Sequence, residues 1–246
     1  MAGWWFAALL GVFCAVSAQA GDAPATQPTI RLASEVWEDY TNADGTGLAW
    51  DILRQVFEPA GVKVVIQSVP YTRSIGLVQR GEADAWVGSY LDEVDERVHY
   101  PHWHYDTDRI SALGLNTQPM PSLANLGRFR LVWMRGYEYQ RYLPGLHDYG
   151  EVLRRDNVLD MLNHGRADFY IDASSEVEEV LGEAADPSHY RVTELTHLPV
   201  YLGFTDSPRG RELAELYDRR MEALVADGSL RPLFKRWQQP YPFDQE

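Results

Sequence analysis

One short pattern occurs twice in this chain, and the repeat constrains the fold more than any other feature. The segment GEADAWVG at 81–88 aligns with GRADFYID at 165–172. Each copy follows an amphipathic stretch, begins with a glycine that can end a helix, and continues into apolar residues typical of a buried strand. Because one copy lies in each half of the chain, we expect two similar lobes that face each other.

The segments around the first copy alternate between strand and helix patterns. Apolar residues Leu48, Ile52 and Val56 recur at helical spacing, and Gly61 follows them. We expect strands at 30–33, 62–69 and 84–87, and helices at 46–57 and 71–80. This β-α-β-α-β order is typical of a largely parallel sheet covered by helices, so the fold class is α/β.

The second half repeats this alternation and ends in helices. We expect strands at 109–115, 129–134, 168–172, 190–195 and 200–205, and helices at 123–126, 157–164, 174–182, 208–227 and 229–237. The 174–182 helix is acidic, and we expect it to be solvated, with no function for Glu176, Glu178 or Glu179.

Two prolines interrupt the pattern between the two halves, within residues 116–122. Such a break is typical of a connection between folded units. We therefore expect lobe 1 to comprise residues 28–116 and 205–240, and lobe 2 to comprise residues 121–202. The chain would cross between the lobes at 116–121 and return at 202–205.

The N-terminal segment predicts export from the cytoplasm. Residues 1–20 are uncharged and largely apolar, and they end in Ala-Gln-Ala. This pattern is typical of a secretory signal peptide cut before Gly21, although Lys and Arg are missing from its start. A retained membrane anchor is the alternative, but the apolar run is short for a span. Cys14, the only cysteine, lies in this segment, so we expect a cysteine-free mature protein in the periplasm.

Composition excludes some partners. The 246 residues carry 22 Lys and Arg against 36 Asp and Glu, a formal net charge of -14. Nucleic-acid binding needs clustered basic residues, so we expect no nucleic-acid partner. We also expect a monomer that uses no cofactor.

Ligands of open α/β sheets bind beyond the carboxyl ends of strands. Ser89 follows the first copy of the motif, Asp172 ends the second, and Arg97 closes the loop after Ser89. Arginine can hold a carboxylate and aspartate an ammonium group, which together suit a small zwitterion. The alternative is that Arg97 pairs with nearby Asp92, Glu93 or Asp95 on the surface.

Aromatic residues occur in several predicted loops and suit the walls of a ligand cleft. Arg73, at the start of the second helix, could point into the same cleft. The aromatic candidates are Trp37, Tyr40, Tyr71, Tyr90, Tyr137 and Tyr139. Ordinary half-buried packing is the alternative for each of these rings.

Catalytic and metal motifs are weak. A metal site is one interpretation of the three nearby histidines, His99, His102 and His104. They lack the i, i+4 spacing of a helical His pair, so we expect no metal site. The sequence contains no G-x-S-x-G elbow and no phosphate-cradling glycine loop. Glu138 and Asp172 could act as acid or base, although no carboxylate pair is singled out.

Several of these features resemble one protein family when taken in order. They are the G-x-A-D segment, the EVDER end of the loop at 93–97, the Arg135-Gly136 turn and the C-terminal pattern at 230–237. From about Thr29 to Trp237, the chain resembles the bacterial periplasmic solute-binding proteins of the polar amino-acid type, family 3. The resemblance implies a two-lobed, type II periplasmic-binding-protein fold with a two-segment hinge and a cleft that closes on a solute.

The resemblance also implies roles for individual residues. Arg97 would bind a ligand carboxylate and Asp172 an amino group, while Ser89-Tyr90 and Gly136-Tyr137 would add hydrogen bonds and Trp37 or Tyr40 would cover the ligand. The expected ligand-binding set is Trp37, Tyr40, Tyr71, Arg73, Ser89, Tyr90, Arg97, Gly136, Tyr137 and Asp172.

The chain also departs from the family pattern. Asp92 and Val94 replace hydroxyl residues of the family loop, and Tyr137 replaces a small one, which puts amino-acid specificity in doubt.

We therefore expect an exported protein that binds a small polar or zwitterionic solute without covalent chemistry, for an ABC permease. Two alternatives use the same scaffold. One is a periplasmic enzyme resembling cyclohexadienyl or arogenate dehydratase, and the other is a sensory binding protein that serves a membrane sensor instead of a transporter.

Overall fold

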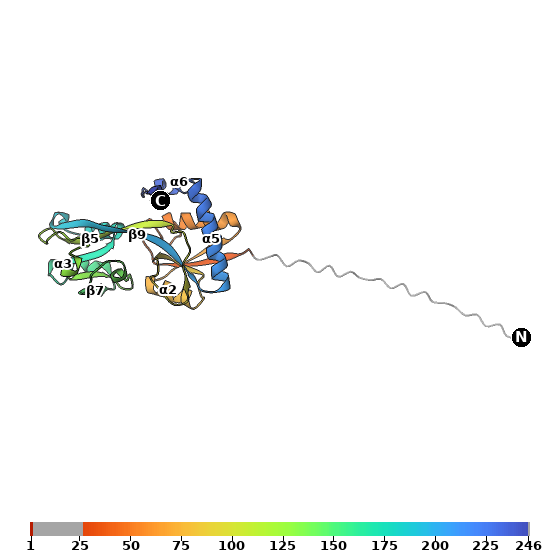
Figure 1. Ribbon diagram of the computed structural model, residues 1–246, viewed down its shortest axis with the longest axis horizontal. Helices are drawn as coiled ribbons and strands as arrows, with labels where there is room; N and C mark the ends of the chain where they lie inside the picture. Colours follow the sequence, from red (N-terminus) through yellow and green to blue (C-terminus); the bar gives the residue numbers. More distant parts are fainter. Residues whose placement is uncertain (2–26, 246) are drawn as a thin grey trace.

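The computed structural model describes Met1 and residues 27–245. Two α/β lobes lie next to each other and are bridged by the long strands β5 and β9 (Figure 1). Apart from Met1, the predicted signal peptide falls outside the described residues. Among the helices that are described, none combines the length and the apolar character needed to cross a membrane.

Lobe 1 contains the elements expected around the first motif copy. The predicted inward face of α1 is confirmed, because Leu48, Ile52, Val56 and Phe57 are all fully buried. Its elements are β1 (Thr29–Ser34), α1 (Leu48–Phe57), β2 (Lys63–Ser68), α2 (Tyr71–Gln79), β3 (Ala85–Tyr90), β4 (Val98–His99), α5 (Pro208–Ala226) and α6 (Arg231–Arg236).

Lobe 2 is built around the second motif copy. Its elements are β6 (Leu131–Met134), β7 (Tyr149–Val152), α3 (Val158–Asn163), β8 (Phe169–Ala173) and α4 (Ser174–Gly182). The helix predicted at 123–126 is instead a single 3-10 turn at Leu126–Arg128. The short strands β4 and β7 were not predicted, because two to four residues give too little periodicity to detect.

The described strands form one continuous sheet, in the order β2-β1-β3-β9-β5-β8-β6-β7, with β4 also paired to β9. Within each lobe the strands next to the motif are parallel: β1 with β2 and β3, and β6 with β7 and β8. The two strands predicted at 190–195 and 200–205 are in fact one strand, β9 (Tyr190–Thr205). Its middle continues in the extended conformation because it pairs with β5 (Asp106–Leu115).

The lobes are connected through the middle of β5 and β9. The lobe 1 end of β9 pairs with β3 from Val200 onward, and the lobe 2 end of β5 pairs with β8 from Ile110 onward. Between these points, residues 107–109 and 197–199 pair only with each other among the described strands. The expected crossings differ from this arrangement: 116–121 follows the outer end of β5 in lobe 2, and 202–205 pairs within lobe 1.

The two motif copies make the same structural contacts. The carboxylate of Asp84 accepts hydrogen bonds from the backbone N–H and the guanidinium of Arg31, at 2.8 and 3.0 Å. Asp168 accepts the equivalent pair from Arg130, at 2.8 and 2.7 Å. The motif aspartates therefore join neighbouring strands and belong to the scaffold rather than to a site.

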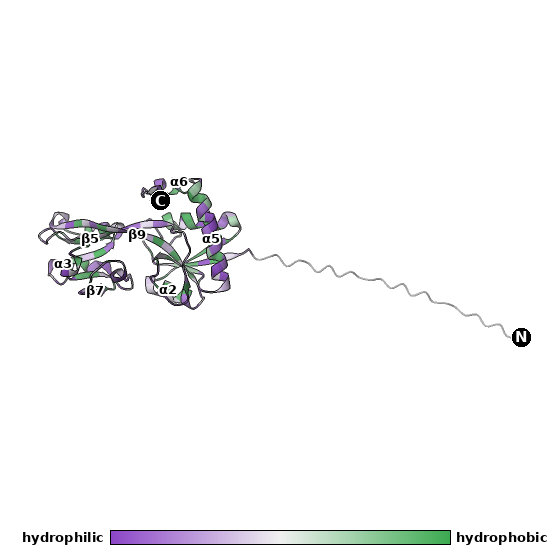
Figure 2. Ribbon diagram, viewed as in Figure 1, coloured by the Kyte–Doolittle hydropathy of each residue, from purple (hydrophilic) through white to green (hydrophobic). Residues whose placement is uncertain are grey.

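The core of lobe 1 extends under α5, which covers one face of the sheet. Leu213, Tyr217 and Met221 are buried along one side of α5, as its apolar stripe predicts. The outer side of α5 is largely hydrophilic (Figure 2). This helix is thus held by its core face and presents charged residues to solvent.

Candidate functional site

A cavity of about 140 Å³ lies between the lobes, beside the segment where the paired strands β5 and β9 run from one lobe to the other. Lobe 1 contributes Trp37, Tyr40, Tyr71 and Tyr90, and lobe 2 contributes residues on and after β6 and β8. Asp106, Thr107, Asp108 and Arg109 of β5 line it as well. A cavity lined by both lobes is the kind of site in which a small molecule can be enclosed.

Six of the ten expected residues line this cavity: Trp37, Tyr40, Tyr71, Tyr90, Tyr137 and Asp172. The other four, Arg73, Ser89, Arg97 and Gly136, do not line it. Arg73 is exposed on α2, and Arg97 is exposed with a left-handed backbone (φ 60°). Two arginines expected in the cleft are therefore absent from its wall.

Ser89 is fully buried and contacts a residue of its own lobe instead of the cavity. Its hydroxyl donates to Glu93 Oε2 at 3.2 Å, and the Tyr90 backbone N–H donates to the same oxygen at 3.2 Å. The Tyr71 hydroxyl lies 2.8 and 2.7 Å from the two Glu93 oxygens. These donors, which could have bound an anionic ligand group, converge on an internal carboxylate.

Glu93 was not predicted to be buried, because it lies in a polar loop sequence. Its side chain is only 3% exposed. Burial raises the pKa of Glu93 to about 7, although hydrogen bonds from Tyr71, Tyr90 and Ser89 oppose the shift. Near neutral pH this carboxyl is consequently shared between its protonated and charged forms.

Trp37 reaches across the cleft from the loop after β1. Its ring lies against Gly88, where the backbone has φ 89° and an added Cβ would be 2.5 Å from the Trp37 Cη2 atom. The indole N–H donates to the Tyr137 hydroxyl of the other lobe at 3.0 Å. Glycine at 88 thus makes room for a ring that joins the two lobes.

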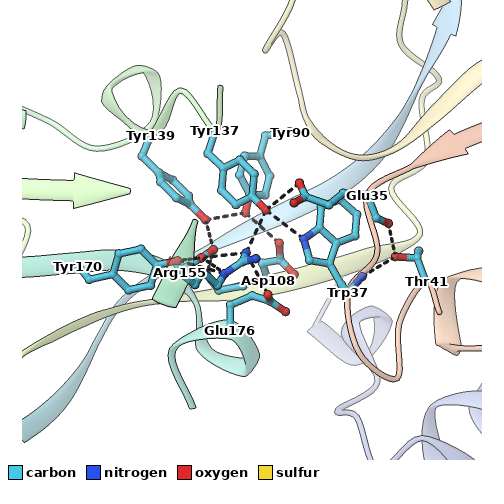
Figure 3. A network of polar contacts seen from close by, with 12 residues as sticks. Glu35, Trp37, Thr41, Tyr90, Asp108, Tyr137, Tyr139, Arg155, Tyr170 and Glu176 are labelled. Atoms are coloured by element: carbon cyan, nitrogen blue, oxygen red, sulfur yellow. Dashed lines mark hydrogen bonds and ion pairs between the residues drawn. The ribbon is translucent and has the colours of Figure 1, made fainter. Parts of the chain in front are cut away.

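Arg155 is a partly buried cation that supports the cavity wall (Figure 3). It comes from the 3-10 turn Arg155–Asn157, before α3, and is 18% exposed. Its guanidinium forms ion pairs with Asp172 at 3.1 Å and Glu176 at 2.9 Å. It also donates to the Tyr137 hydroxyl at 3.0 Å. Sequence reasoning missed this residue, because no local pattern distinguishes it from neighbouring Arg154.

The Tyr137 hydroxyl is the meeting point of the two lobes in this network (Figure 3). It accepts from Trp37 and Arg155 and donates to Glu35 Oε2 at 3.4 Å. A phenol has one proton to donate and can accept two hydrogen bonds, so this group is fully used.

Asp172 is surrounded by donors. The Tyr170 hydroxyl donates to its Oδ2, and the Tyr139 hydroxyl donates to its Oδ1 at 3.3 Å. With Arg155 also bound and only 1% of its side chain exposed, Asp172 has little capacity left for a ligand ammonium group.

The position of Glu176 shows that the prediction of a solvated 174–182 helix was wrong on one face. Helix α4 is not solvated on all sides, since Glu176 is buried and lines the cavity. Burial raises the pKa of Glu176 to about 8, against the opposing effect of Arg155. On Arg155 itself, burial opposes the charge, but Asp172, Tyr137, Tyr170 and Glu176 together raise its pKa. A residue of the cavity wall therefore lies on a helix whose acidic sequence is typical of a solvated surface.

Two further carboxyl groups lie on β5 where it crosses between the lobes. Asp106 is buried, with its Oδ1 accepting the Thr107 N–H at 2.8 Å, and Asp108 accepts the Tyr90 hydroxyl at 2.8 Å. Burial and the charge of Asp108 raise the pKa of Asp106 to about 8. Burial raises that of Asp108 to about 6. Neither residue was singled out for the cleft by the sequence.

The histidine segment forms no metal centre among the described residues, where no three His, Cys, Asp or Glu side chains are grouped to hold an ion. The His104 ring packs on Phe243 and its Nδ1 lies 2.9 Å from the Asp106 carbonyl oxygen. Glu138, considered as an acid or base, has a left-handed backbone (φ 50°) and is not part of the cavity wall.

Solved structures share this fold at low sequence identity. A histidine kinase sensor domain has a TM-score of 0.67 at 14% identity, covering 86% of this chain and 96% of its own. The ancestral amino acid-binding protein AncCDT-1, a precursor of cyclohexadienyl dehydratase, has a TM-score of 0.64 at 19% identity, covering 85% and 95%.

A third similar structure is an amino acid ABC transporter substrate-binding protein, AbpA from Streptococcus pneumoniae, bound to L-arginine. It has a TM-score of 0.64 at 15% identity, covering 85% of this chain and 94% of its own. At such identities the likeness establishes the two-lobed fold, as the resemblance implied. No curated protein matches the sequence.

The family comparison covers most of the chain. The model of the bacterial extracellular solute-binding proteins, family 3, matches residues 37–240, which include lobe 2, lobe 1 apart from β1, and all residues of the cavity wall. The chain belongs to the bacterial extracellular solute-binding proteins of family 3.

Proposed function

We propose that this protein captures a small polar, amino-acid-like solute in the cavity between its lobes. The observation that carries the proposal is the cavity itself, whose wall combines Trp37 and Tyr90 of lobe 1 with Tyr137 and Asp172 of lobe 2. A ligand in contact with both walls would favour the closed arrangement, because it binds that arrangement better than an open one.

The solute would be delivered to an ABC permease from the periplasm. Family membership and the transporter-associated relative support this role, and the apolar N-terminal segment supports export. A membrane sensor is the alternative partner, since a kinase sensor domain shares the fold. The six lining residues Trp37, Tyr40, Tyr71, Tyr90, Tyr137 and Asp172 are proposed as the ligand contacts or their direct supports.

Native mass spectrometry of the freshly purified protein tests the binding role. We expect an added mass of a small molecule that disappears on denaturation. Trp37→Ala should weaken retention of that molecule, because it removes one wall and the bond to Tyr137. Trp103→Ala, outside the cavity wall, is the control. If no adduct is found and no polar solute in a broad panel raises the melting temperature, the binding role is wrong.

An enzymatic role is a second candidate, favoured by Glu176. This carboxyl lines the cavity, and burial raises its pKa, which favours the protonated form that a general acid requires. A dehydration of a prephenate-like acid would be followed by NMR of the mixture. A new product that is lost in Glu176→Gln supports catalysis, whereas an unchanged substrate spectrum across the panel rules this role out.

A further inference from the structure

The buried donors near the cavity that could bind an anion are already occupied by carboxylates of the protein. Arg155 is paired with Asp172 and Glu176. The Ser89 hydroxyl and the Tyr90 N–H are bonded to Glu93. An anionic ligand group would have to displace one of these internal carboxylates, which would leave a buried charge unpaired.

Carboxyl groups without a cationic partner remain in the same cavity. Asp106 and Asp108 are two residues apart on β5, so their side chains lie on one face of the strand. Their hydrogen bonds come from a backbone N–H and a tyrosine hydroxyl, and neither forms an ion pair within the described part of the chain. Asp106 is only 8% exposed. Buried carboxylates are costly unless a positive charge is nearby.

The other charged residues of the wall do not restore the balance. Glu38, Asp39 and Glu178 add negative charge, and all three are exposed. Arg109 is the one arginine or lysine among the lining residues, and it is exposed as well. The carboxyls of the inner wall, Asp106 and Asp108, are therefore not paired with a lysine or arginine among the described residues.

Aromatic rings complete this end of the cavity. Tyr40, Tyr90 and Tyr139 line it, and the Tyr90 and Tyr139 rings lie 6.0 Å apart. The faces of aromatic rings attract cations, most strongly where water is excluded. Rings beside unpaired carboxyls thus make a wall suited to an organic cation.

The volume of the cavity and the side chains around it further restrict which ligands can bind. The described residues provide no cluster of three His, Cys, Asp or Glu groups for a metal ion. The volume of about 140 Å³ is close to that of an engineered cavity of roughly 150 Å³ that holds benzene. A ligand with only a few non-hydrogen atoms fits this space.

We propose that the solute is a small organic cation, with an ammonium or amidinium group held by Asp106 and Asp108 against the rings of Tyr40, Tyr90 and Tyr139. This inference rests on the proposed function and names the chemical class of its ligand. It replaces the expected zwitterion, because the buried donors that could hold a carboxylate, Arg155, Ser89 and the Tyr90 N–H, already bind carboxylates of the protein.

A set of four-carbon probes tests the sign of the ligand charge at nearly constant length. The cations are 1,4-diaminobutane, butylammonium and butylguanidinium. Neutral 1,4-butanediol, dianionic succinate and zwitterionic 4-aminobutyrate are the controls. We expect at least one cation to raise the melting temperature at pH 8 and the three controls to leave it unchanged. Calorimetry then gives the affinity of the cation that responds.

Matched variants test whether the cation binds at Asp106 and Asp108. Asp108→Asn and Asp106→Asn each remove one charge while keeping the side-chain shape, and each should weaken cation binding by roughly tenfold to a hundredfold. Glu222→Gln removes the same charge from the exposed side of α5 and should leave the affinity unchanged. Both aspartate variants should fold, since they remove a buried charge.

Three results would overturn the inference. In the first, none of the three cations raises the melting temperature. In the second, only succinate or 4-aminobutyrate raises it. In the third, the affinity for the cation is unchanged by both aspartate substitutions. Binding of succinate, the diol or the zwitterion would still leave the proposed function in place. Failure of that function is measured separately: no small molecule co-purifies with the protein, and no added solute binds to it.

Discussion

At the scale of single residues, Arg155 holds together the lobe 2 side of the cleft (Figure 3). Its guanidinium contacts Asp172, Glu176 and the Tyr137 hydroxyl, all in a largely buried setting. Such a group is valuable mainly because its loss leaves two buried carboxylates unpaired.

We expect Arg155→Ala to lower the free energy of unfolding by about 3–5 kcal/mol, the range for breaking a buried ion pair by removing one partner. Urea unfolding measures this change. Arg154→Ala is the matched control, because Arg154 pairs with Asp156 at the surface and its loss should cost less than about 1 kcal/mol. Equal effects of the two substitutions would contradict the structural role of Arg155.

Glu93 should make stability depend on pH. Its pKa rises from 4.5 to about 7 on folding, so between these values the folded protein holds a proton that the unfolded chain releases. Stability from this group is therefore present below pH 4.5 and is lost as the pH rises to 7. At about 1.4 kcal/mol per pH unit, the loss is on the order of 3 kcal/mol.

Glu93→Gln does not titrate, so its stability relative to the natural protein should increase between pH 5 and pH 8. Urea unfolding at both pH values gives this difference. Glu96→Gln, an exposed neighbour in the same loop, should show no such trend. A difference for Glu93→Gln that stays constant with pH would mean that Glu93 is charged throughout.

At the scale of elements, the lobes meet where the turn after β6 approaches α2. Gly136 has φ 86°, and an added Cβ would lie 2.5 Å from the Thr72 Cγ2 atom of the opposite lobe. The adjacent 3-10 turn Tyr139–Arg141 contacts lobe 1 as well, since Arg141 donates to the Asp92 carbonyl at 3.2 Å. The close approach of two elements thus depends on the absence of one side chain.

We expect Gly136→Ala to hold the lobes apart and to weaken ligand binding at least tenfold, measured by calorimetry with the ligand that responds. Gly145→Ala is the control: its backbone is also left-handed (φ 70°), but no atom lies within 4 Å of the added Cβ. Both changes carry a backbone cost of about 1–2 kcal/mol. Only the first should alter affinity, and an equal loss in both would show that strain, not the lobe contact, matters.

At the scale of the whole molecule, two long strands carry the chain between the lobes. Residues 107–109 and 197–199 pair with each other and lie between the parts of the sheet that belong to each lobe (Figure 1). Asp108 is both in this crossing and in the cavity wall, so the proposed ligand contact lies on the segment that connects the lobes.

Release of the ligand should therefore change the shape of the protein. We expect small-angle scattering to give a larger radius of gyration without ligand than with saturating ligand, because the contact between Trp37 and Tyr137 is lost when the lobes separate. The same measurement on Trp37→Ala should show a smaller ligand-dependent change. An identical radius in both states of the natural protein would exclude lobe closure.

Much of this architecture could be predicted from the sequence, because its signals are local. Helix α1 follows from apolar spacing, and α5 follows from a long stripe ended by Gly228. The repeated G-x-A-D segment correctly indicated two similar lobes and placed Asp172 at a strand end in the cleft. Six of the ten residues expected to bind ligand line the cavity, because aromatic residues and a carboxylate near strand ends tend to face a cleft; their contact with a ligand stays a prediction.

The partners of the charged groups were decided by tertiary structure alone. Trp37 and Tyr137 are 100 positions apart, and Arg155 reaches Asp172 across 17. No local pattern shows that Glu93 turns inward or that Arg97 turns out to solvent, because both outcomes suit a polar loop. By itself, the sequence determined the two lobes and the edge at which they meet. Only the packed structure decided which charges cancel there, because burial and pairing depend on residues distant in the chain.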